Sequence, residues 1–376
     1  MSTRLSRVAS WMTMFVGVAG SAAAQQTDSL RRAFSERFDI GTALAARQLV
    51  PPDRATLNLV AEQFSVVTPE NVMKWSLIHP TPDRYDFVAA DALVEFAADN
   101  GLKVVGHTLV WHSQCPRWVF QDERGDPISR DALIERMRDH IHTVVGRYRG
   151  RVQGWDVVNE AILDDGAWRD TPWRRLIGDD YLDLAFRFAH EADPDTELYY
   201  NDFSMTKPGK RRAATGLVER FRRAGVPIHG VGLQGHWGLD YPSEQEIDDA
   251  LADYSKLGVH VMITELDIDV LPRPDEEQGA DVGRGARRTD ALDPYRDGLP
   301  ESVQQTLADR YAACFRLFNR HADAITRVTF WGVDDGQTWH NNWPVPGRTA
   351  HSLIFDRQLR PKPAYQAILD TATEPR

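Results

Sequence analysis

Cysteine is scarce in this chain of 376 residues, which has only Cys115 and Cys314. Cys115 falls in a predicted loop and Cys314 in a predicted helix, and the two are far apart in the sequence. Two such residues do not make a disulfide framework or a cysteine metal site. We therefore expect the cysteines not to pair, and the fold to depend on its hydrophobic core.

Positive charge is also in deficit. The chain has 44 Lys and Arg residues against 55 Asp and Glu residues, which gives a formal net charge of −11 at pH 7. A polyanionic partner such as nucleic acid would be repelled by this charge. The composition favours a soluble protein that acts on a neutral substrate.

Long apolar runs are missing beyond the first 24 residues, so we predict no interaction with a membrane. The first 24 residues combine Arg4 and Arg7, the apolar run "VASWMTMFVGVAG" and the small residues "SAAA" before Gln25. This order is typical of a secretory signal peptide cleaved near Ala24. A membrane anchor is the alternative, but the run is short for a bilayer span. We predict a secreted or periplasmic protein whose mature chain starts at about residue 25.

Several catalytic motifs are absent as well. The chain has no G-x-G-x-x-G after its first predicted strand, which argues against a dinucleotide-binding fold. It has no G-x-S-x-G, which argues against a serine hydrolase of the α/β type. It also has no H-E-x-x-H spacing, and His107, His112 and His236 do not stand in an H-x-H spacing, so these three histidines do not indicate a metal site. We predict neither a metal nor a cofactor.

What the chain does contain is a regular alternation of short β-branched runs and amphipathic stretches. The eight runs span residues 38–44, 64–70, 103–111, 152–160, 197–203, 230–236, 260–268 and 325–333. Helical spacing follows at residues 91–101, 131–148, 243–258 and 302–318, and Ser243 with Glu246 has the spacing of a capping box. Eight strand–helix units predict one α/β domain at residues 25–376, a closed (β/α)8 TIM barrel. An open doubly wound sheet is the runner-up.

One segment interrupts this alternation. Residues 272–300 are rich in Pro, Gly and charged residues and poor in core residues. They predict a long loop after the seventh strand. Two interpretations remain open at this point: the loop either shapes the rim of an active site or is a surface excursion.

Polar and tryptophan residues gather where the predicted strands end, which is the catalytic face of such a barrel. In order along the chain these are Glu70, Asn71, Lys74, His107, Trp111, Asn159, Glu160, Tyr200, Gln234, His236, Glu265, Asp267, Trp331 and Trp339. Each residue alone has a structural explanation, but their joint presence at one end of successive strands predicts a pocket.

Glu160 and Glu265 are the two candidate catalytic carboxyl groups. They end strands four and seven, which lie on opposite sides of an eight-stranded barrel, so they can face each other. A pair of facing carboxyl groups performs glycoside hydrolysis, and tryptophan faces stack on sugar rings. We expect the negative charge of Glu265 to raise the proton affinity of Glu160.

The chain resembles a known family at this point. The segments "TPENVMKW", "GHTLVWHSQCPRW", "GWDVVNEAI", "YYNDF", "GLQGHW", "ITELDI" and "FWGVDDGQTW" occur in this order over residues 35–370. Together they resemble glycoside hydrolase family 10, the retaining endo-β-1,4-xylanases. The resemblance implies hydrolysis of internal β-1,4-xylosidic bonds in xylan and xylo-oligosaccharides by double displacement.

The same resemblance implies roles for single residues. It makes Glu160 the general acid/base and Glu265 the nucleophile, with Asn159 bound to the sugar 2-hydroxyl. It makes His236 and Asp267 the pair that orients Glu265. The implied sugar contacts are Glu70, Asn71, Lys74, His107, Trp111, Gln234, Trp331 and Trp339, with Tyr200 on the leaving-group side.

Two alternatives and one departure stay open. A β-1,4-glucanase or a mixed-specificity glycosidase would share these carboxyl groups, and a non-catalytic xylan-binding barrel would share the fold. The presence of both glutamates argues against the binding protein. In "GVDDGQTW" the pair Asp334 and Asp335 departs from the family's common Thr-Asp, which puts the local hydrogen bonding near Trp339 in doubt. We expect a monomer.

Overall fold

The computed structural model describes residues 29–274 and 285–374. The predicted signal peptide and the middle of the predicted 272–300 loop lie outside the described residues. Within the described ranges, no helix combines the length and apolarity needed to cross a membrane.

Eight parallel strands close into a barrel, as the sequence predicts. They are β1 (Asp39–Leu44), β2 (Val66–Pro69), β3 (Lys103–Val110), β4 (Gly154–Asn159), β5 (Glu197–Asp202), β6 (Gly230–Leu233), β8 (His260–Asp269) and β9 (Ile325–Phe330). Strand β1 pairs with β9, and β6 pairs with β8, so the sheet has no free edge between them. The fold is a single-domain (β/α)8 barrel.

The sixth predicted run is divided in two. Strand β6 ends at Leu233, and a short strand β7 (His236–Gly238) begins after Gly235, whose φ of 85° breaks the extended backbone. Strand β7 pairs with the later part of β8 and sets His236 opposite Asp267. This break brings the histidine to the mouth of the barrel.

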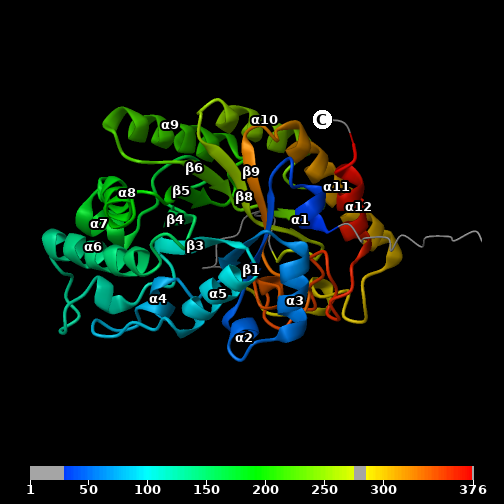
Figure 1. Ribbon diagram of the computed structural model, residues 1–376, viewed down its shortest axis with the longest axis horizontal. Helices are drawn as coiled ribbons and strands as arrows, with labels where there is room; N and C mark the ends of the chain where they lie inside the picture. The colour runs from blue at the N-terminus through cyan, green and yellow to red at the C-terminus, as the bar shows by residue number, and fades with distance from the viewer. Residues whose placement is uncertain (1–28, 275–284, 375–376) are drawn as a thin grey trace, which may run out of the picture.

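Helices surround the barrel (Figure 1). They are α1 (Leu30–Ala33), α2 (Ala46–Leu49), α3 (Arg54–Gln63), α4 (Trp75–Ile78), α5 (Val88–Asp99), α6 (Arg130–Arg147), α7 (Pro172–Ile177), α8 (Tyr181–Ala192), α9 (Pro208–Ala224), α10 (Glu244–Ser255), α11 (Glu301–Arg320) and α12 (Pro363–Thr371). The short 3₁₀ helices of the described residues are η1 (Arg117–Val119), η2 (Asp290–Leu292) and η3 (Trp339–Asn341). The predicted capping box of α10 is confirmed, because Ser243 and Glu246 bond to each other's backbone N–H.

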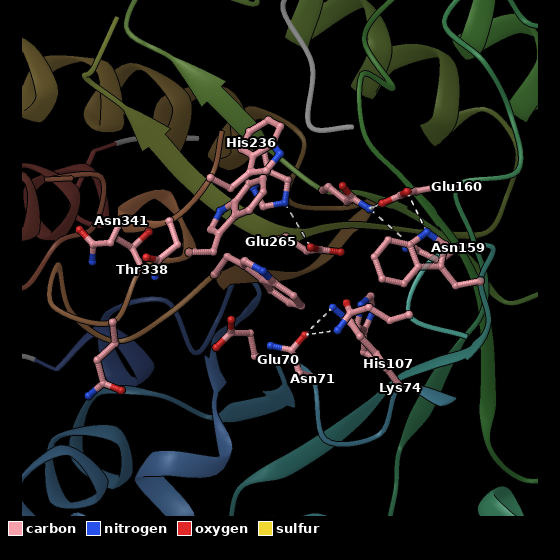
Figure 2. A pocket seen from close by; sticks show the side chains of 18 of the residues that line it. Glu70, Asn71, Lys74, His107, Asn159, Glu160, His236, Glu265, Thr338 and Asn341 are labelled. Carbon is pink, nitrogen blue, oxygen red and sulfur yellow. Dashed lines mark hydrogen bonds and ion pairs between the residues drawn. The ribbon is translucent and has the colours of Figure 1, made fainter. Parts of the chain in front are cut away.

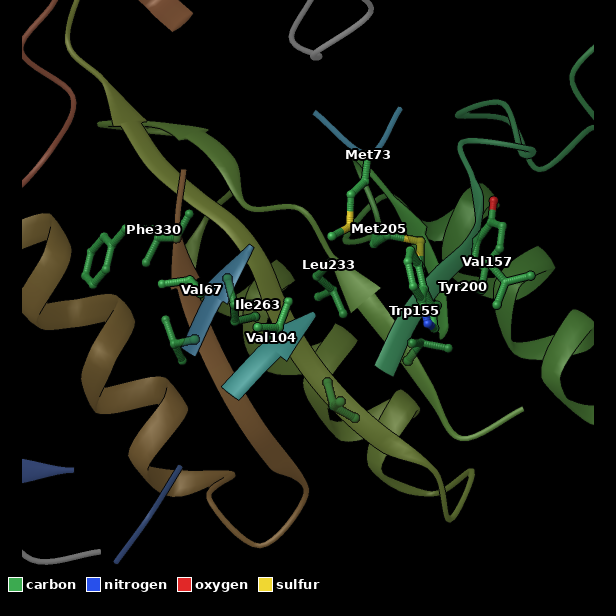
Figure 3. Close-up of a cluster of buried hydrophobic side chains, with 14 of the residues drawn as sticks. Val67, Met73, Val104, Trp155, Val157, Tyr200, Met205, Leu233, Ile263 and Phe330 are labelled. Carbon is green, nitrogen blue, oxygen red and sulfur yellow. The ribbon is translucent and has the colours of Figure 1, made fainter. Parts of the chain in front are cut away.

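The barrel interior is filled by pairing large side chains with glycines. Tyr199 occupies the interior beside Gly154 and Gly230, and a methyl group added at Gly154 would lie 2.4 Å from the tyrosine ring. The larger core lies between the strands and the helices, where strand side chains such as Val104, Trp155 and Ile263 are buried (Figure 3). The polar residues at the barrel mouth therefore rest on a fully packed base.

Trp155 anchors strand β4, which leads to Glu160. Its side chain is buried on the outer face of the barrel, next to Gly106 of β3 in the strand register. A methyl group at Gly106 would lie 2.2 Å from the Trp155 ring, closer than any van der Waals contact. The glycine is needed because the indole fills the space that a side chain would take.

The described part of the 272–300 segment packs against the loop after β9. Ala286 N–H donates to the Pro344 carbonyl at 2.8 Å. Asp293 is buried, and its carboxylate accepts bonds from Arg288 and Arg296. The segment thus supports a loop that carries residues of the cavity wall, which favours the rim interpretation over that of a surface excursion.

The cysteine prediction is confirmed. Both residues are free, with Cys115 half-buried in a loop and Cys314 buried in α11. The described fold therefore contains no disulfide, and the packed core must supply its stability.

We predict that Gly106→Ala lowers the free energy of unfolding by about 1–3 kcal/mol, because overpacking forces the indole or the strand to move. Gly146 of α6 offers a matched control, since a methyl group there meets nothing within 4 Å. Gly146→Ala should instead raise stability by roughly 0.5–1 kcal/mol. Urea unfolding measures both values, and an equal effect of the two changes would contradict this account of Trp155 packing.

Candidate active site

A cavity of about 370 Å³ opens at the carboxyl ends of the strands (Figure 2). The predicted site residues that line it are Glu70, Asn71, Lys74, His107, Trp111, Asn159, Glu160, Gln234, His236, Glu265, Trp331 and Trp339. The strand ends and following loops of β2, β3, β4, β6, β8 and β9 supply them, together with β7, which carries His236. The cavity brings together every predicted residue except Asp267 and Tyr200.

Glu160 follows directly after β4 and is only 5% exposed. Its carboxyl oxygens accept bonds from Trp111 Nε1 at 2.8 Å and from Gln234 Nε2 at 3.0 Å. Burial, followed by the negative charge of Asp202, raises the pKa of Glu160 to about 7. Glu265 also raises the pKa of Glu160, as expected from the sequence, but its effect is smaller than those of burial and Asp202.

The backbone of Glu160 has a φ of 59°, in the left-handed region that residues with a Cβ rarely adopt. This conformation costs roughly 1–2 kcal/mol for such a residue. It persists only where the surroundings hold it. The Glu160 N–H donates to the Asn201 carbonyl at 2.9 Å, and the Glu160 carbonyl accepts from Arg169 Nε at 2.9 Å.

Glu265 lies within β8 and is equally buried, but its partners differ. Its carboxylate accepts from Asn201 Nδ2 at 2.7 Å and lies 3.2 Å from His236 Nε2. Burial alone would raise the pKa of Glu265, but the hydrogen bond from His236 and nearby positive charge outweigh it and lower this pKa below its ordinary value. Between the two pKa values Glu265 is therefore ionised, whereas Glu160 is still mostly protonated.

His236 lies between two carboxylates. Its Nδ1 is 3.1 Å from Asp267 Oδ2, and its Nε2 faces Glu265. Burial alone would lower the pKa of His236, but the two carboxylates raise it to about 9. Because both partners are acceptors only, both ring nitrogens must donate, and His236 is an imidazolium.

Asp267 is held by more than His236. It also accepts from Trp339 Nε1 at 2.7 Å and lies 3.0 Å from His340 Nε2. Burial alone would raise the pKa of Asp267, but the two histidines lower it far below its usual range. Asp267 does not line the cavity, so it acts on the site through His236 and Trp339.

His236, Asp267 and His340 are also the described residues whose spacing could fit a metal ion, with ligand atoms within 4.8 Å of one another. All three side chains are already joined by hydrogen bonds within the group, because each histidine contacts one carboxylate oxygen of Asp267. Asp269, 3.6 Å from His340 Nδ1 and 3.4 Å from Arg348, continues the same chain. We interpret the group as a charge-balanced chain behind Glu265.

The residues after β2 form a second polar wall. Lys74 Nζ donates to Asn71 Oδ1 at 3.1 Å and lies 4.9 Å from the centre of the Trp111 ring. Burial lowers the pKa of Lys74, and the acids Glu265, Glu70 and Glu160 offset part of this effect. Burial also raises the pKa of Glu70. This wall offers both a cation and acceptors to a ligand.

Two tryptophans and a histidine shape the rest of the cavity. His107 Nδ1 is fixed by Asp156 Oδ2 at 2.9 Å, and its ring meets Trp331 edge-on, 5.2 Å between ring centres. Trp339 stacks on Trp343 at 4.5 Å between ring centres. These contacts fix the indole rings that face the cavity.

The departure at Asp334 and Asp335 leaves Trp339 well held. Asp334 accepts from Gly336 N–H at 2.8 Å, and Asp335 pairs with Lys362 at 2.8 Å. Thr338, the residue before Trp339, contacts Ser352 at 3.0 Å. The two acids thus fix the turn that leads into η3.

Tyr200 does not face the cavity, contrary to its predicted place on the leaving-group side. Its side chain is completely buried, and its hydroxyl donates to Asp202 Oδ2 at 2.5 Å. Successive strand residues alternate between the two faces of a sheet. Asn201, the next residue, points inward and contacts Glu265, so Tyr200 points outward.

Several lining residues were not predicted as part of the site. They are Arg47, Gln114, Gly336, Gln337, Thr338, Asn341, Asn342 and Trp343. They lie in the segments after β1, β3 and β9, with Arg47 in α2 and Asn341 in η3, where strand-end patterns carry no information on side-chain direction. The run 337–343 is continuously polar or aromatic, which is the one signal that could have found most of them.

The fold and this pair of carboxyl groups define a class of protein. A (β/α)8 barrel carries a protonated and an ionised carboxyl group in one tryptophan-lined cavity. This arrangement is that of a barrel glycoside hydrolase.

Comparison with known proteins gives the family. The sequence profile of glycosyl hydrolase family 10 matches residues 29–371, and the chain belongs to this family. It is 44% identical to endo-1,4-beta-xylanase A of Xylanibacter ruminicola, over 93% of this chain and 95% of that protein. A GH10 endoxylanase retrieved from a sugarcane soil metagenome superposes with a TM-score of 0.89 at 45% identity, over 91% of this chain and 99% of that one. The crystal structure of xylanase XynB of Paenibacillus barcinonensis superposes with a TM-score of 0.83 at 41% identity, over 92% of this chain and 99% of that one.

Replacing Glu160 by Gln tests its raised pKa through stability. Some acids have a higher pKa in the folded state than in the unfolded state. Such an acid increasingly destabilises the fold as the pH rises from its unfolded-state pKa to its folded-state pKa. The ordinary value is 4.5 and the folded value about 7. The stability of Glu160→Gln relative to the wild type should therefore increase by about 2–3 kcal/mol between pH 5 and pH 8. Denaturant unfolding at both pH values measures it, and a pH-independent difference would contradict the raised pKa.

Proposed function

We propose that this protein is an endo-1,4-β-xylanase that hydrolyses internal β-1,4-xylosidic bonds with retention of anomeric configuration. One observation carries the proposal: two buried carboxyl groups share a cavity but have pKa values shifted in opposite directions. Such a pair supplies a proton donor and a nucleophile at the same pH. Double displacement needs both.

In the first step, Glu265 Oε attacks the anomeric carbon C1 while the bond from C1 to the leaving oxygen breaks. Glu160 donates its proton to that oxygen, which leaves as a hydroxyl group on the departing chain. The product is an ester between Glu265 and the sugar. Asn201 and His236 hold the Glu265 carboxylate in position before the attack.

In the second step, water attacks C1 from the side that the leaving group vacated. Glu160, now ionised, takes the water proton, and Glu265 is released as a carboxylate. The negative charge of Glu265 is absent from the intermediate, and this charge helps to raise the pKa of Glu160. Its loss favours the ionised Glu160 that the step requires.

Sugar recognition is assigned to the remaining wall residues. Asn159 Oδ1 accepts from Asn201 and Gln234, which leaves its amide N–H groups for the sugar 2-hydroxyl. Lys74 and Glu70 offer a donor and an acceptor to further hydroxyls. The faces of Trp331 and Trp339 suit the apolar faces of sugar rings. The names of the related xylanases support xylan as the substrate.

The related glucanase activity would use the same carboxyl pair and would differ only in accepting the C6 hydroxymethyl group of glucose. The indole rings of Trp331 and Trp339 are fixed by their neighbours, which favours the narrower xylose. A non-catalytic binding barrel would have no need for opposite pKa shifts at Glu160 and Glu265. We retain the xylanase assignment for these reasons.

We further propose that the mature chain acts outside the cytoplasm as a monomer. The organisation of residues 1–24 supports export. The mass of the exported protein should correspond to a chain that starts near Gln25.

The exported protein should release short xylo-oligosaccharides from unsubstituted xylan and little or nothing from carboxymethyl-cellulose. Glu265→Ala should lose several orders of magnitude in rate, because the nucleophile has no substitute. Chromatography of early products measures both. Cleavage of cellulose alone would make the substrate assignment wrong, and binding of xylan without cleavage by the wild type would favour the binding protein.

A further inference from the structure

The two residues after Glu160 are held by side chains of β5. Ala161 N–H donates to the Tyr200 hydroxyl at 3.1 Å, and Ile162 N–H donates to Asp202 Oδ2 at 3.3 Å. The Tyr200 hydroxyl in turn donates to the same Asp202 oxygen at 2.5 Å. These bonds fix the backbone immediately after Glu160. A change of φ at Glu160 would have to move this backbone segment.

Asp202 is itself fixed from the other side. Its Oδ1 accepts from Lys210 Nζ of α9 at 2.9 Å, and both side chains are completely buried. Lys210 also lies 3.2 Å from Asp164 in the loop after β4, and 3.9 Å from the centre of the Phe203 ring. A buried ion pair with these additional contacts is rigid, so Asp202 can serve as a firm support for the Tyr200 hydroxyl.

We propose that Tyr200, Asp202 and Lys210 form a positioning unit that holds Glu160 in its left-handed conformation. The unit touches no part of the cavity and acts on the reaction through the backbone of residues 160–162. It keeps the carboxyl group of Glu160 within reach of Trp111 and Gln234, and therefore of the leaving oxygen. The inference rests on the proposed role of Glu160 as the general acid/base.

Such a role has a kinetic signature that sugar binding and general folding defects lack. A poor leaving group, such as a sugar hydroxyl, needs the proton of Glu160 to depart. An activated leaving group, such as 2,4-dinitrophenolate, is a stable anion and departs without it. Misplacement of Glu160 should therefore slow glycosylation by the first kind of substrate and leave the second unaffected.

Tyr200→Phe removes only the hydroxyl and keeps the packed ring. The kcat/KM for xylopentaose should fall about tenfold or more, a part of the roughly 10²–10⁴ that a positioned general acid contributes. The kcat/KM for 2,4-dinitrophenyl β-xylobioside should stay within about twofold of the wild type, since a proton donor contributes nothing to its departure. Tyr254→Phe is the matched control, because Tyr254 is also completely buried and donates its hydroxyl to the Met205 carbonyl at 3.0 Å. The control should change neither value.

An equal fall for both substrates would overturn the proposal, because it would indicate a role in sugar binding or folding. No fall for either would also overturn it, because Tyr200 would then only pack. A crystal structure of Tyr200→Phe adds a measurement that is independent of activity. An unchanged left-handed φ and an unchanged carboxyl position at Glu160 would contradict the role of the positioning unit. If the wild type cleaves neither substrate, the proposed function fails, and this crystal structure still decides whether the unit holds Glu160.

Discussion

His236 lies between Glu265 and Asp267 and donates one ring N–H to each, and the chemistry of the cavity depends on this placement. Two carboxyl groups removed from water in one cavity would both tend to take up protons. The imidazolium supplies a positive charge to one of them. Glu265 therefore stays ionised, while Glu160, which has only the neutral donors Trp111 and Gln234, keeps its proton.

The surrounding fold maintains this asymmetry. Asp267 compensates the charge of His236 and is tied by Trp339 and His340 to the loop after β9. That loop is in turn supported by the segment 285–300. On the other side of the cavity, Asp202 contributes negative charge without facing the ligand. The barrel thus places Asp202 and Asp267, which help to set these charges, behind the residues that line the cavity.

Much of this could be predicted from the sequence. Eight β-branched runs with helical stretches between them identify a barrel because the periodicity of strands and helices is local. The barrel then brings strand ends together, so the polar residues after each strand define the cavity without further information. Glu160 and Glu265 were found in this way.

Other features could not be predicted, for physical reasons. Tyr200 and Asn201 are neighbours on one strand, and only the register of β5 decides which of them points inward. The left-handed conformation of Glu160 and the burial of Lys210 depend on tertiary packing, which composition does not encode. Arg47 of α2 and the loop residues Gln114 and Trp343 line the cavity because of the paths that the segments after the strands take, which have no periodic signal. The relative effects of neighbouring charges on the pKa of Glu160 likewise depend on tertiary structure. Asp202 raises this pKa more than Glu265 does.

The most direct test of the central claim is an NMR titration of protein carrying ¹³C at the glutamate side-chain carboxyl carbons, with Glu160→Gln and Glu265→Gln variants for assignment. We expect the Glu160 signal to titrate with a pKa of about 7 and the Glu265 signal to titrate with a pKa below the ordinary glutamate value of 4.5. Two carboxyl groups that both titrate near 4.5, or a higher pKa at Glu265 than at Glu160, would contradict this claim.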